Sequence, residues 1–296
     1  MSQIRTESIV AISFIEKLKC YAQILKLKIT VFVVISAVFG YFIGASTYNL
    51  TEIISLIIGG FLVTGSANTF NQIIERNHDK LMKRTEGRPL PQNKLNVAEV
   101  TIFAFLSGII GIAVLWMSLN PLSGILGLLA IFMYAAVYTP LKQISPYAVF
   151  VGAFPGAIPP MLGFVASTGS FGFEAGMLFA VQFLWQFPHF WAIAWRLHSQ
   201  YQKAGFKMLP YDKKNKTSAV IIFISSLLLM ISSFLPEYFN VTGRIATIGL
   251  FLFSCLMVIP AFQLMQTQDD KYALRVMLMS YLYLILSLLF ILVDKI

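Results

Sequence analysis

Nine apolar segments, each close to the length that a helix needs to cross a lipid bilayer, dominate this 296-residue sequence. Charged residues make up only 12% of the chain, against about 25% in ordinary soluble domains. The segments stay apolar through successive residues, whereas the strands of a membrane barrel alternate polar and apolar residues. We therefore expect an all-α, polytopic membrane protein with nine transmembrane helices. The predicted spans are residues 27–45, 51–72, 97–117, 121–139, 146–167, 173–196, 217–235, 244–265 and 274–293.

The basic residues predict an N-terminus inside and a C-terminus outside, because Lys and Arg accumulate in cytoplasmic loops. With nine spans in that orientation, twenty of the 22 basic residues lie on the cytoplasmic side, and only Arg244 and Lys295 lie outside. This bias, together with anionic lipids, accounts for most of the net charge of +9. The charge therefore predicts contact with membrane lipid and no nucleic-acid partner.

The first residues of the chain differ from the rest. Residues 1–26 lack the pattern of a secretory signal, so we expect them to be retained. Their spacing of apolar and charged residues predicts an amphipathic helix on the inner membrane surface, a cytoplasmic or interfacial segment. The apolar positions of this helix are Phe14, Leu18, Tyr21 and Leu25. Residues 27–296 form a single membrane domain, and Cys20 and Cys255 are predicted to be ordinary thiols.

Three oxygen-bearing residues stand where the second apolar span ends. Asn71, Glu75 and Asp79 recur at every fourth position, so on a helix they lie within an arc of roughly 80°. Mg²⁺ typically takes one or two carboxylates and completes its shell with water and substrate phosphates. This face predicts a magnesium site, and a diphosphate is the ligand expected to complete it.

Basic residues follow these oxygens closely. Arg84 and Arg88 can form forked hydrogen bonds to phosphate oxygens. Lys80 and Lys83 fit better as surface lysines that follow the positive-inside bias. Lys142 is the sole basic residue of its loop and is expected to reach the same diphosphate.

A second group of polar residues lies in the span at 173–196. Its members fall within about 80° on a helical wheel, among aromatic side chains. They are Gln182, Gln186, His189 and Arg196. This stripe predicts the lining of a pocket for a large planar ligand, with His189 as an axial ligand or hydrogen-bond donor. The alternative is a stripe that serves helix packing alone.

Two neighbouring features admit more than one interpretation. His198 would face the opposite side of the span if the helix continued, so it is a weaker candidate than His189. The prolines Pro155, Pro159 and Pro160 predict either a bent helix beside a pocket or a packing device.

These residues together resemble the UbiA superfamily of intramembrane prenyltransferases, over nearly the whole chain. The superfamily motif N-x-x-x-[DE]-x-x-x-D matches Asn71, Glu75 and Asp79. The extension E-R-x-x-D-x-L-M-x-R-T-x-x-R-P-L-P, at 75–91, is more specific. The segment 188–210 is typical of the branch that acts on haem. Tyr138 and Lys142 resemble the superfamily's Tyr-x-x-x-Lys element.

The sequence departs from the superfamily pattern in two places. Asn77 stands where many relatives have Asp. Ser199 and Gln200 occupy positions where an acidic residue is common in the second motif. Water, Gln200 or Asp212 remain as substitutes for that missing carboxylate.

The resemblance implies transfer of farnesyl from farnesyl diphosphate to the 2-vinyl group of haem B, with addition of water, giving haem O and diphosphate. Mg²⁺ is the implied cofactor, held by Asn71, Glu75 and Asp79. The implied diphosphate-binding residues are Arg84, Arg88, Lys142, Lys203 and Tyr138. The implied haem-binding residues are His189, Gln186, Arg196 and His198. The resemblance also implies a plasma-membrane location with a cytoplasmic-facing site, and a downstream haem A synthase or oxidase-assembly partner.

Two other functions remain open at this point. A transporter or channel would also use nine spans and buried polar groups, although the sequence contains no convincing inverted repeat. A prenyltransferase that acts on a quinone precursor or another aromatic ring is the third interpretation. The segments 75–91 and 188–210 favour haem over it.

Overall fold

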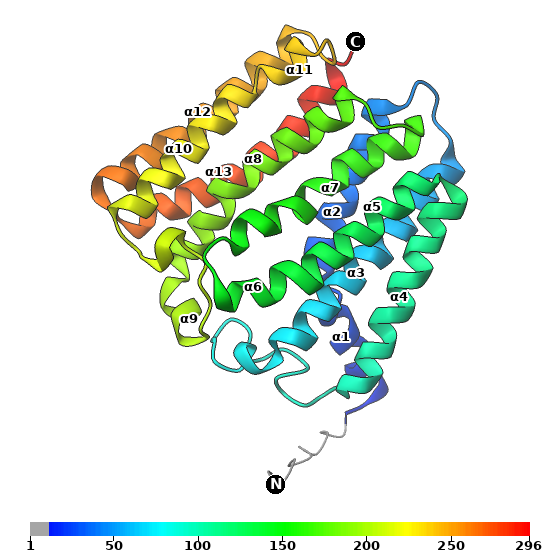
Figure 1. Ribbon diagram of the computed structural model, residues 1–296, viewed down its shortest axis with the longest axis vertical. Helices are drawn as coiled ribbons and strands as arrows, with labels where there is room; N and C mark the ends of the chain where they lie inside the picture. The colour runs from blue at the N-terminus through cyan, green and yellow to red at the C-terminus, as the bar shows by residue number, and fades with distance from the viewer. Residues whose placement is uncertain (1–11) are drawn as a thin grey trace.

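The chain folds into long helices that lie side by side, as seen in a computed structural model that describes residues 12–296 (Figure 1). Within this range no strand is formed, and the extended pairing is an isolated bridge between Thr242 and Lys295. The elements are α1 (Phe14–Ile24), α2 (Leu27–Gly44), α3 (Leu50–Asp79), α4 (Val97–Ser118), α5 (Pro121–Phe132), the π-helix η1 (Met133–Tyr138), α6 (Thr139–Ile144), α7 (Ala148–Thr168), α8 (Phe173–Arg196), α9 (His198–Lys203), the 3₁₀ turn η2 (Pro210–Asp212), α10 (Lys216–Ser232), α11 (Leu235–Tyr238), α12 (Arg244–Thr267) and α13 (Asp270–Val293). The predicted all-α class is confirmed.

Eight stretches of helix in the described part of the chain are long and apolar enough to cross a membrane. They coincide with eight of the nine predicted spans. The remaining predicted span, 173–196, is the 24-residue helix α8, which is long enough. Its mean hydropathy is lower than that of the other eight because it contains glutamines and His189.

Asparagine side chains determine where several of the long helices begin. In each case the side-chain oxygen accepts a hydrogen bond from a backbone N–H in the first turn, which would otherwise lack a partner. The caps are Asn49 for α3, Asn96 for α4, Asn120 for α5 and Asn215 for α10, at 2.8 to 3.1 Å. Polar residues at the ends of apolar segments thus fix the boundaries of the helices.

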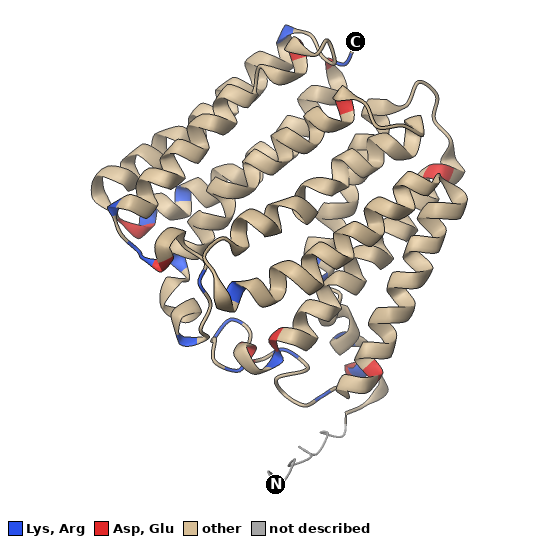
Figure 2. Cartoon of the chain, viewed as in Figure 1, with Lys and Arg blue, Asp and Glu red and all other residues tan. Residues whose placement is uncertain are grey.

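The helices form one bundle with charged residues mainly at one end. On one side, α2 packs against α7, α7 against α8, and α8 against α13; on the other, α3 packs against α4. Figure 2 shows that most Lys, Arg, Asp and Glu gather at the end that holds α1, α6 and α9, and few lie at the opposite end. Both predicted regions of polar residues extend to this charged end.

Helix α1 is attached to the connection between α3 and α4. Cys20 and Ile24 are buried against Leu90, Leu95 and Val100. The opposite face of α1 exposes the apolar side chains Phe14, Ile15 and Leu18. The predicted segment thus contains a helix with exposed apolar side chains, and its position on the membrane surface stays a prediction; residues 1–11 of the segment lie outside the described range.

Helices α2 and α7 approach so closely that only glycine fits at two positions. A Cβ atom on Gly163 would overlap the carbonyl oxygen of Ala37, and one on Gly40 would overlap that of Pro160. Small residues permit such approaches between membrane helices. The proline-containing segment of α7 therefore takes part in this tight packing against α2, while the chain stays helical through Pro155, Pro159 and Pro160.

We expect Gly163→Ala to lower the stability of the protein by about 1–3 kcal/mol, because the added methyl group meets backbone and forces α2 and α7 apart. Thermal unfolding in detergent measures the effect. Gly176→Ala in α8 is the matched control, since nothing lies within 4 Å of a Cβ added there. Equal stability of the two variants would contradict the tight packing.

Candidate active site

The three predicted metal-binding residues lie on one buried face at the end of α3. Asn71, Glu75 and Asp79 are 1%, 4% and 0% exposed. Burying two carboxylates and an amide without partners would be costly, so their neighbours must satisfy them. The partners of this oxygen face define the site.

Each residue of the oxygen face is paired with a basic side chain from elsewhere in the chain. The Lys142 ammonium lies 2.7 Å from Glu75 Oε1, and Arg88 Nη1 lies 2.7 Å from Asp79 Oδ2. Lys26 Nζ donates a hydrogen bond of 2.9 Å to Asn71 Oδ1. The site therefore alternates oxygens and cations within a buried space.

The donors on this face suit Mg²⁺. Asp79 Oδ1 is buried and has no hydrogen-bond partner among the described residues, so it is free to bind a cation. The described part of the chain holds no group of three His, Cys, Asp or Glu side chains that could form a closed metal cage. Mg²⁺ does not require one, because it keeps waters and takes substrate phosphates as ligands. Two carboxylates and an amide fit that requirement.

A π-helix positions Lys142. The helix that follows α5 widens to a π-helix over Met133–Tyr138 before α6 begins. Just after it, Thr139 Oγ1 accepts a hydrogen bond from Asn71 Nδ2 at 3.1 Å. Lys142 Nζ lies 4.3 Å from the centroid of the Tyr138 ring, within range of a cation–π contact. The predicted pair of Tyr138 and Lys142 thus lies directly beside the oxygen face.

The connection that follows α8 folds back onto the segment that contains the end of α3 and the residues after it, up to residue 91. His78 Nδ1 lies 2.8 Å from the carbonyl oxygen of Ala204, and the backbone N–H of Lys207 donates to the carbonyl of Lys142 at 2.7 Å. The Arg84 N–H donates to Gln200 Oε1 at 3.3 Å. The two regions singled out in the sequence therefore meet in space, and Gln200 contacts the segment 75–91 at Arg84.

Asp212 is the other predicted substitute for the missing acidic residue. Its Oδ1 is buried without a hydrogen-bond partner among the described residues. Tyr211 and Asp212 both have left-handed backbone angles, with φ of 54° and 53°. Such angles are costly for residues other than glycine. No contact joins Asp212 to the oxygen face, so its proposed role in metal binding stays a prediction.

The predicted haem stripe on α8 is only partly assembled. Gln182, Gln186 and His189 are buried, but Arg196 is exposed at the end of the helix, with Nη1 3.7 Å from the sulfur of Met277. Arg196 is the last residue of α8, so it shares the predicted face of the helix but lies exposed at its end. Its role in haem binding stays a prediction.

Three other candidates are less buried than the oxygen face. Arg84 and Lys203 are exposed, and His198 is half-buried at the start of α9. The helix does not continue from α8 into α9, because Leu197 has φ −101° and ψ 12°. The wheel position expected for His198 therefore does not apply.

His189 is held firmly between α8 and α13. Its ring stacks on Trp185 at 4.6 Å, and its Nδ1 lies 2.8 Å from Ser280 Oγ. The Ser280 hydroxyl donates to the carbonyl of Met277 at 2.6 Å, so it accepts from His189. Nδ1 is then the protonated nitrogen, and Nε2 keeps its lone pair for a ligand.

Gln186 contacts a different helix from His189. A Cβ atom on Gly156 of α7 would lie only 2.5 Å from Gln186 Nε2, so this side chain packs directly on the α7 backbone. The polar stripe therefore serves helix packing at Gln186, as one interpretation of the sequence expected, while His189 keeps one nitrogen available.

Lys26 is a site residue that the sequence did not reveal. It precedes α2 in a left-handed conformation, with φ 49°, and its ammonium group points to Asn71, which is 45 positions away. Burial of that group, with a further effect of the nearby Arg88, lowers the pKa of Lys26 to about 7. Nothing in the local sequence distinguishes this lysine from its neighbours at the membrane surface.

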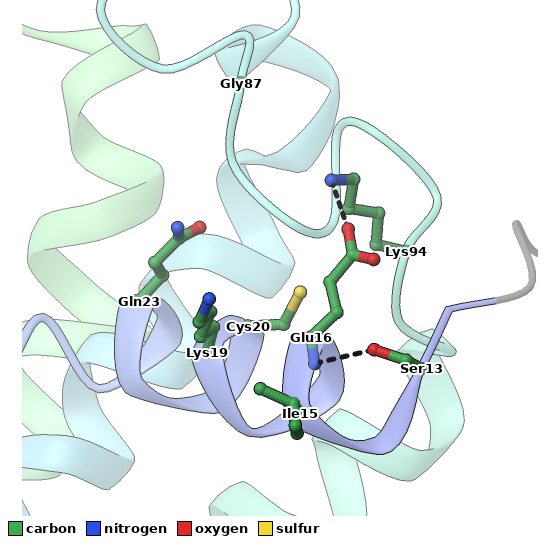
Figure 3. Close-up of a pocket in the computed structure, with 8 residues that line it drawn as sticks. All are labelled: Ser13, Ile15, Glu16, Lys19, Cys20, Gln23, Gly87 and Lys94. Atoms are coloured by element: carbon green, nitrogen blue, oxygen red, sulfur yellow. Dashed lines mark hydrogen bonds and ion pairs between the residues drawn. The ribbon is translucent and has the colours of Figure 1, made fainter.

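A separate polar cavity of about 400 Å³ lies between α1 and the connection after α3 (Figure 3). Glu16 in its wall pairs with Lys94 at 2.8 Å, and its backbone N–H donates to Ser13 Oγ at 3.2 Å. Gly87 also lines this cavity, next to Arg88 in the chain. None of the predicted catalytic or haem-binding residues lines it, so it is distinct from the oxygen face.

Comparison with known proteins shows which family the chain belongs to. The UbiA prenyltransferase family model matches residues 33–288. A protein of Christiangramia forsetii is 42% identical over 280 residues, covering 93% of each chain, and one of Cytophaga hutchinsonii is 43% identical over 282 residues, covering 94% of this chain and 98% of the relative. Both are named protoheme IX farnesyltransferase.

Solved structures share the fold. A structure described under the biosynthesis of digeranylgeranylglyceryl phosphate synthase has a TM-score of 0.79 at 20% identity, covering 94% of this chain and 98% of its own. A UbiA homolog from Archaeoglobus fulgidus bound to GPP and Mg²⁺ has a TM-score of 0.65 at 13% identity, covering 92% and 99%. The family match extends over most of the chain and includes the whole oxygen face. The chain belongs to the UbiA prenyltransferase family.

Proposed function

We propose that the protein transfers the farnesyl group of farnesyl diphosphate to the 2-vinyl group of haem B, with addition of water, giving haem O and diphosphate. Family membership makes the protein a transferase, which removes the transporter alternative. The names of relatives that are 40–43% identical over more than nine-tenths of this chain support haem as the acceptor. The observation that carries the proposal is the buried oxygen face with its ring of cations.

The charged residues serve departure of diphosphate. Breaking the allylic C–O bond leaves the electron pair on the diphosphate and a cation on the farnesyl carbon. Lys142 and Arg88 lie where they would bind the oxygens that gain negative charge. Mg²⁺ held by Asn71, Glu75 and Asp79 would add further positive charge to that leaving group.

The acceptor completes the reaction. The electron-rich vinyl group attacks the allylic carbon, and water then adds to the new cation beside the porphyrin and loses a proton. We assign His189 to haem binding through Nε2, because Ser280 and Trp185 fix the ring. Gln186, Arg196 and His198 remain proposed haem-binding residues at the edges of that region.

The membrane orientation is part of the proposal. We infer nine membrane spans, namely the eight long apolar helices and α8, with the N-terminus inside and the C-terminus outside. The gathering of charged residues at the end that holds α1, α6 and α9 supports this orientation (Figure 2). The active site then faces the cytoplasm at the plasma membrane, where a haem A synthase or oxidase-assembly partner would receive the product.

The proposal is tested by incubating purified protein with haem B, farnesyl diphosphate and Mg²⁺, with and without a chelator. Chromatography with mass detection then separates the haems. A chelator-sensitive product with the mass of haem O is expected. A folded protein that binds farnesyl diphosphate but gives no such product would point to another acceptor, such as a quinone precursor.

We expect His189→Ala to weaken haem binding roughly tenfold or more while farnesyl diphosphate binding changes little, since one bond to the acceptor is lost. Absorption titration with haem and calorimetry with farnesyl diphosphate provide the two affinities. Glu237→Ala is the control, because Glu237 lies in α11, pairs with Arg244 and belongs to neither proposed binding site. Equal losses of both affinities in His189→Ala would assign this residue a structural role.

A further inference from the structure

The three cations of the site come from three separate parts of the chain. Lys26 precedes α2, Lys142 lies on α6, and Arg88 lies in the connection after α3. Each is bonded to an oxygen of a different residue of the oxygen face, at 2.9, 2.7 and 2.7 Å respectively. One oxygen of each predicted metal-binding residue is therefore paired with a cation expected to bind diphosphate, and Asp79 Oδ1 is left without a hydrogen-bond partner in the part of the chain that the structure describes.

A ligand that uses the paired oxygens or the cations has to break these pairs; Asp79 Oδ1, which has no hydrogen-bond partner among the described residues, is available to a metal without such a break. A metal ion that takes the oxygens would remain close to several displaced positive groups, and like charges repel strongly in a buried site. A diphosphate that draws the cations away would leave Glu75 and Asp79 buried without partners. Both penalties disappear when the two ligands arrive together, because the metal pairs with the oxygens and the diphosphate with the cations.

We propose that Lys26, Lys142 and Arg88 change partners together, from the oxygen face to the diphosphate, so that metal and diphosphate bind with strong positive coupling. Lys26 thereby joins the diphosphate-binding residues as a third cation of the site. This inference rests on the proposed prenyl transfer and adds how its first substrate is recognised. Coupling between two ligands is reciprocal, so each raises the affinity for the other by the same factor.

The coupling is measured with inorganic pyrophosphate as the probe. Calorimetry on detergent-purified protein gives the pyrophosphate affinity in the presence of chelator and again at saturating Mg²⁺. Association of Mg²⁺ with pyrophosphate in solution is the same for every protein variant, so it cancels when variants are compared. The ratio of the two affinities in wild type is expected to exceed that of Lys26→Met by roughly tenfold.

Lys26→Met is the most informative change because it removes the charge and leaves only a neutral amide, Asn71, without its partner. Its affinity for Mn²⁺ alone, measured by electron paramagnetic resonance, is expected to rise, whereas a loss of pyrophosphate affinity is expected with Mg²⁺ present. Lys17→Met is the matched control, since Lys17 pairs with Glu99 on the exposed surface. If thermal unfolding shows that Lys26→Met is misfolded, Lys26→Gln replaces it.

The outcomes separate this inference from the proposed function. Suppose that wild type binds pyrophosphate and makes the farnesylated haem, and that a folded Lys26 variant has the same affinity ratio as wild type. That result overturns the exchange of partners and leaves the proposed function standing. Wild type that binds no pyrophosphate at any Mg²⁺ concentration overturns the proposed prenyl transfer as well.

Discussion

Asp79→Ala is expected to abolish measurable turnover, a loss of about a thousandfold or more, and to leave the protein folded. Asp79 is fully buried, and its Oδ1 has no hydrogen-bond partner among the described residues, which makes this oxygen the one best placed to bind Mg²⁺. Folding should survive because the partner left behind, Arg88, is 21% exposed and can be solvated.

Chromatographic separation of the haem product measures the turnover of Asp79→Ala, and thermal unfolding in detergent checks its fold. Glu237→Ala is a suitable control, because Glu237 is an acidic residue that pairs with Arg244 and lies in α11, at the opposite end of the bundle (Figure 1). Wild-type activity in a folded Asp79→Ala protein would remove this residue from the metal site.

Lys142→Met is expected to lower both stability and turnover. Glu75 and Lys142 side chains are 6% and 11% exposed, so removing the lysine leaves a buried carboxylate without its ion-pair partner. Such losses typically amount to about 3–5 kcal/mol. Turnover should fall as well, since the same ammonium group is assigned to the leaving diphosphate.

A double variant tests the structural effect of Lys142→Met. Adding Glu75→Gln removes the unpaired charge, so the double variant should regain most of the unfolding free energy, while turnover stays low because Glu75 is itself a proposed metal ligand. Thermal unfolding and the haem assay are measured on the same preparations. Recovery of activity together with stability would show that Lys142 acts only as a structural partner of Glu75.

Local periodicity was sufficient to predict the oxygen face but not its partners. Asn71, Glu75 and Asp79 lie on one helix, so their common face follows from helix geometry alone. The partner Lys142 was predicted because it stands alone in its loop, whereas Lys26 was not, since several lysines surround it in the sequence. Contacts between distant segments depend on how helices pack, and that information is spread over the whole chain.

The stripe on α8 shows the same limit at a helix end. The helical wheel gave His198 a side only if the helix continued, but α8 ends at Arg196 and the backbone turns at Leu197. Ser280, which orients His189, lies on α13 and has no motif of its own. A wheel predicts directions within a helix, not where that helix stops or which neighbour it meets.

The π-helix at Met133–Tyr138 affects how this sequence should be aligned with others. Each π turn contains more residues than an α turn, so a relative with a regular helix reaches the position of Lys142 with one residue fewer. An alignment that allows no gap within 133–138 would then match Lys142 to its neighbour. A one-residue gap there restores the correct pairing of the lysine that binds Glu75.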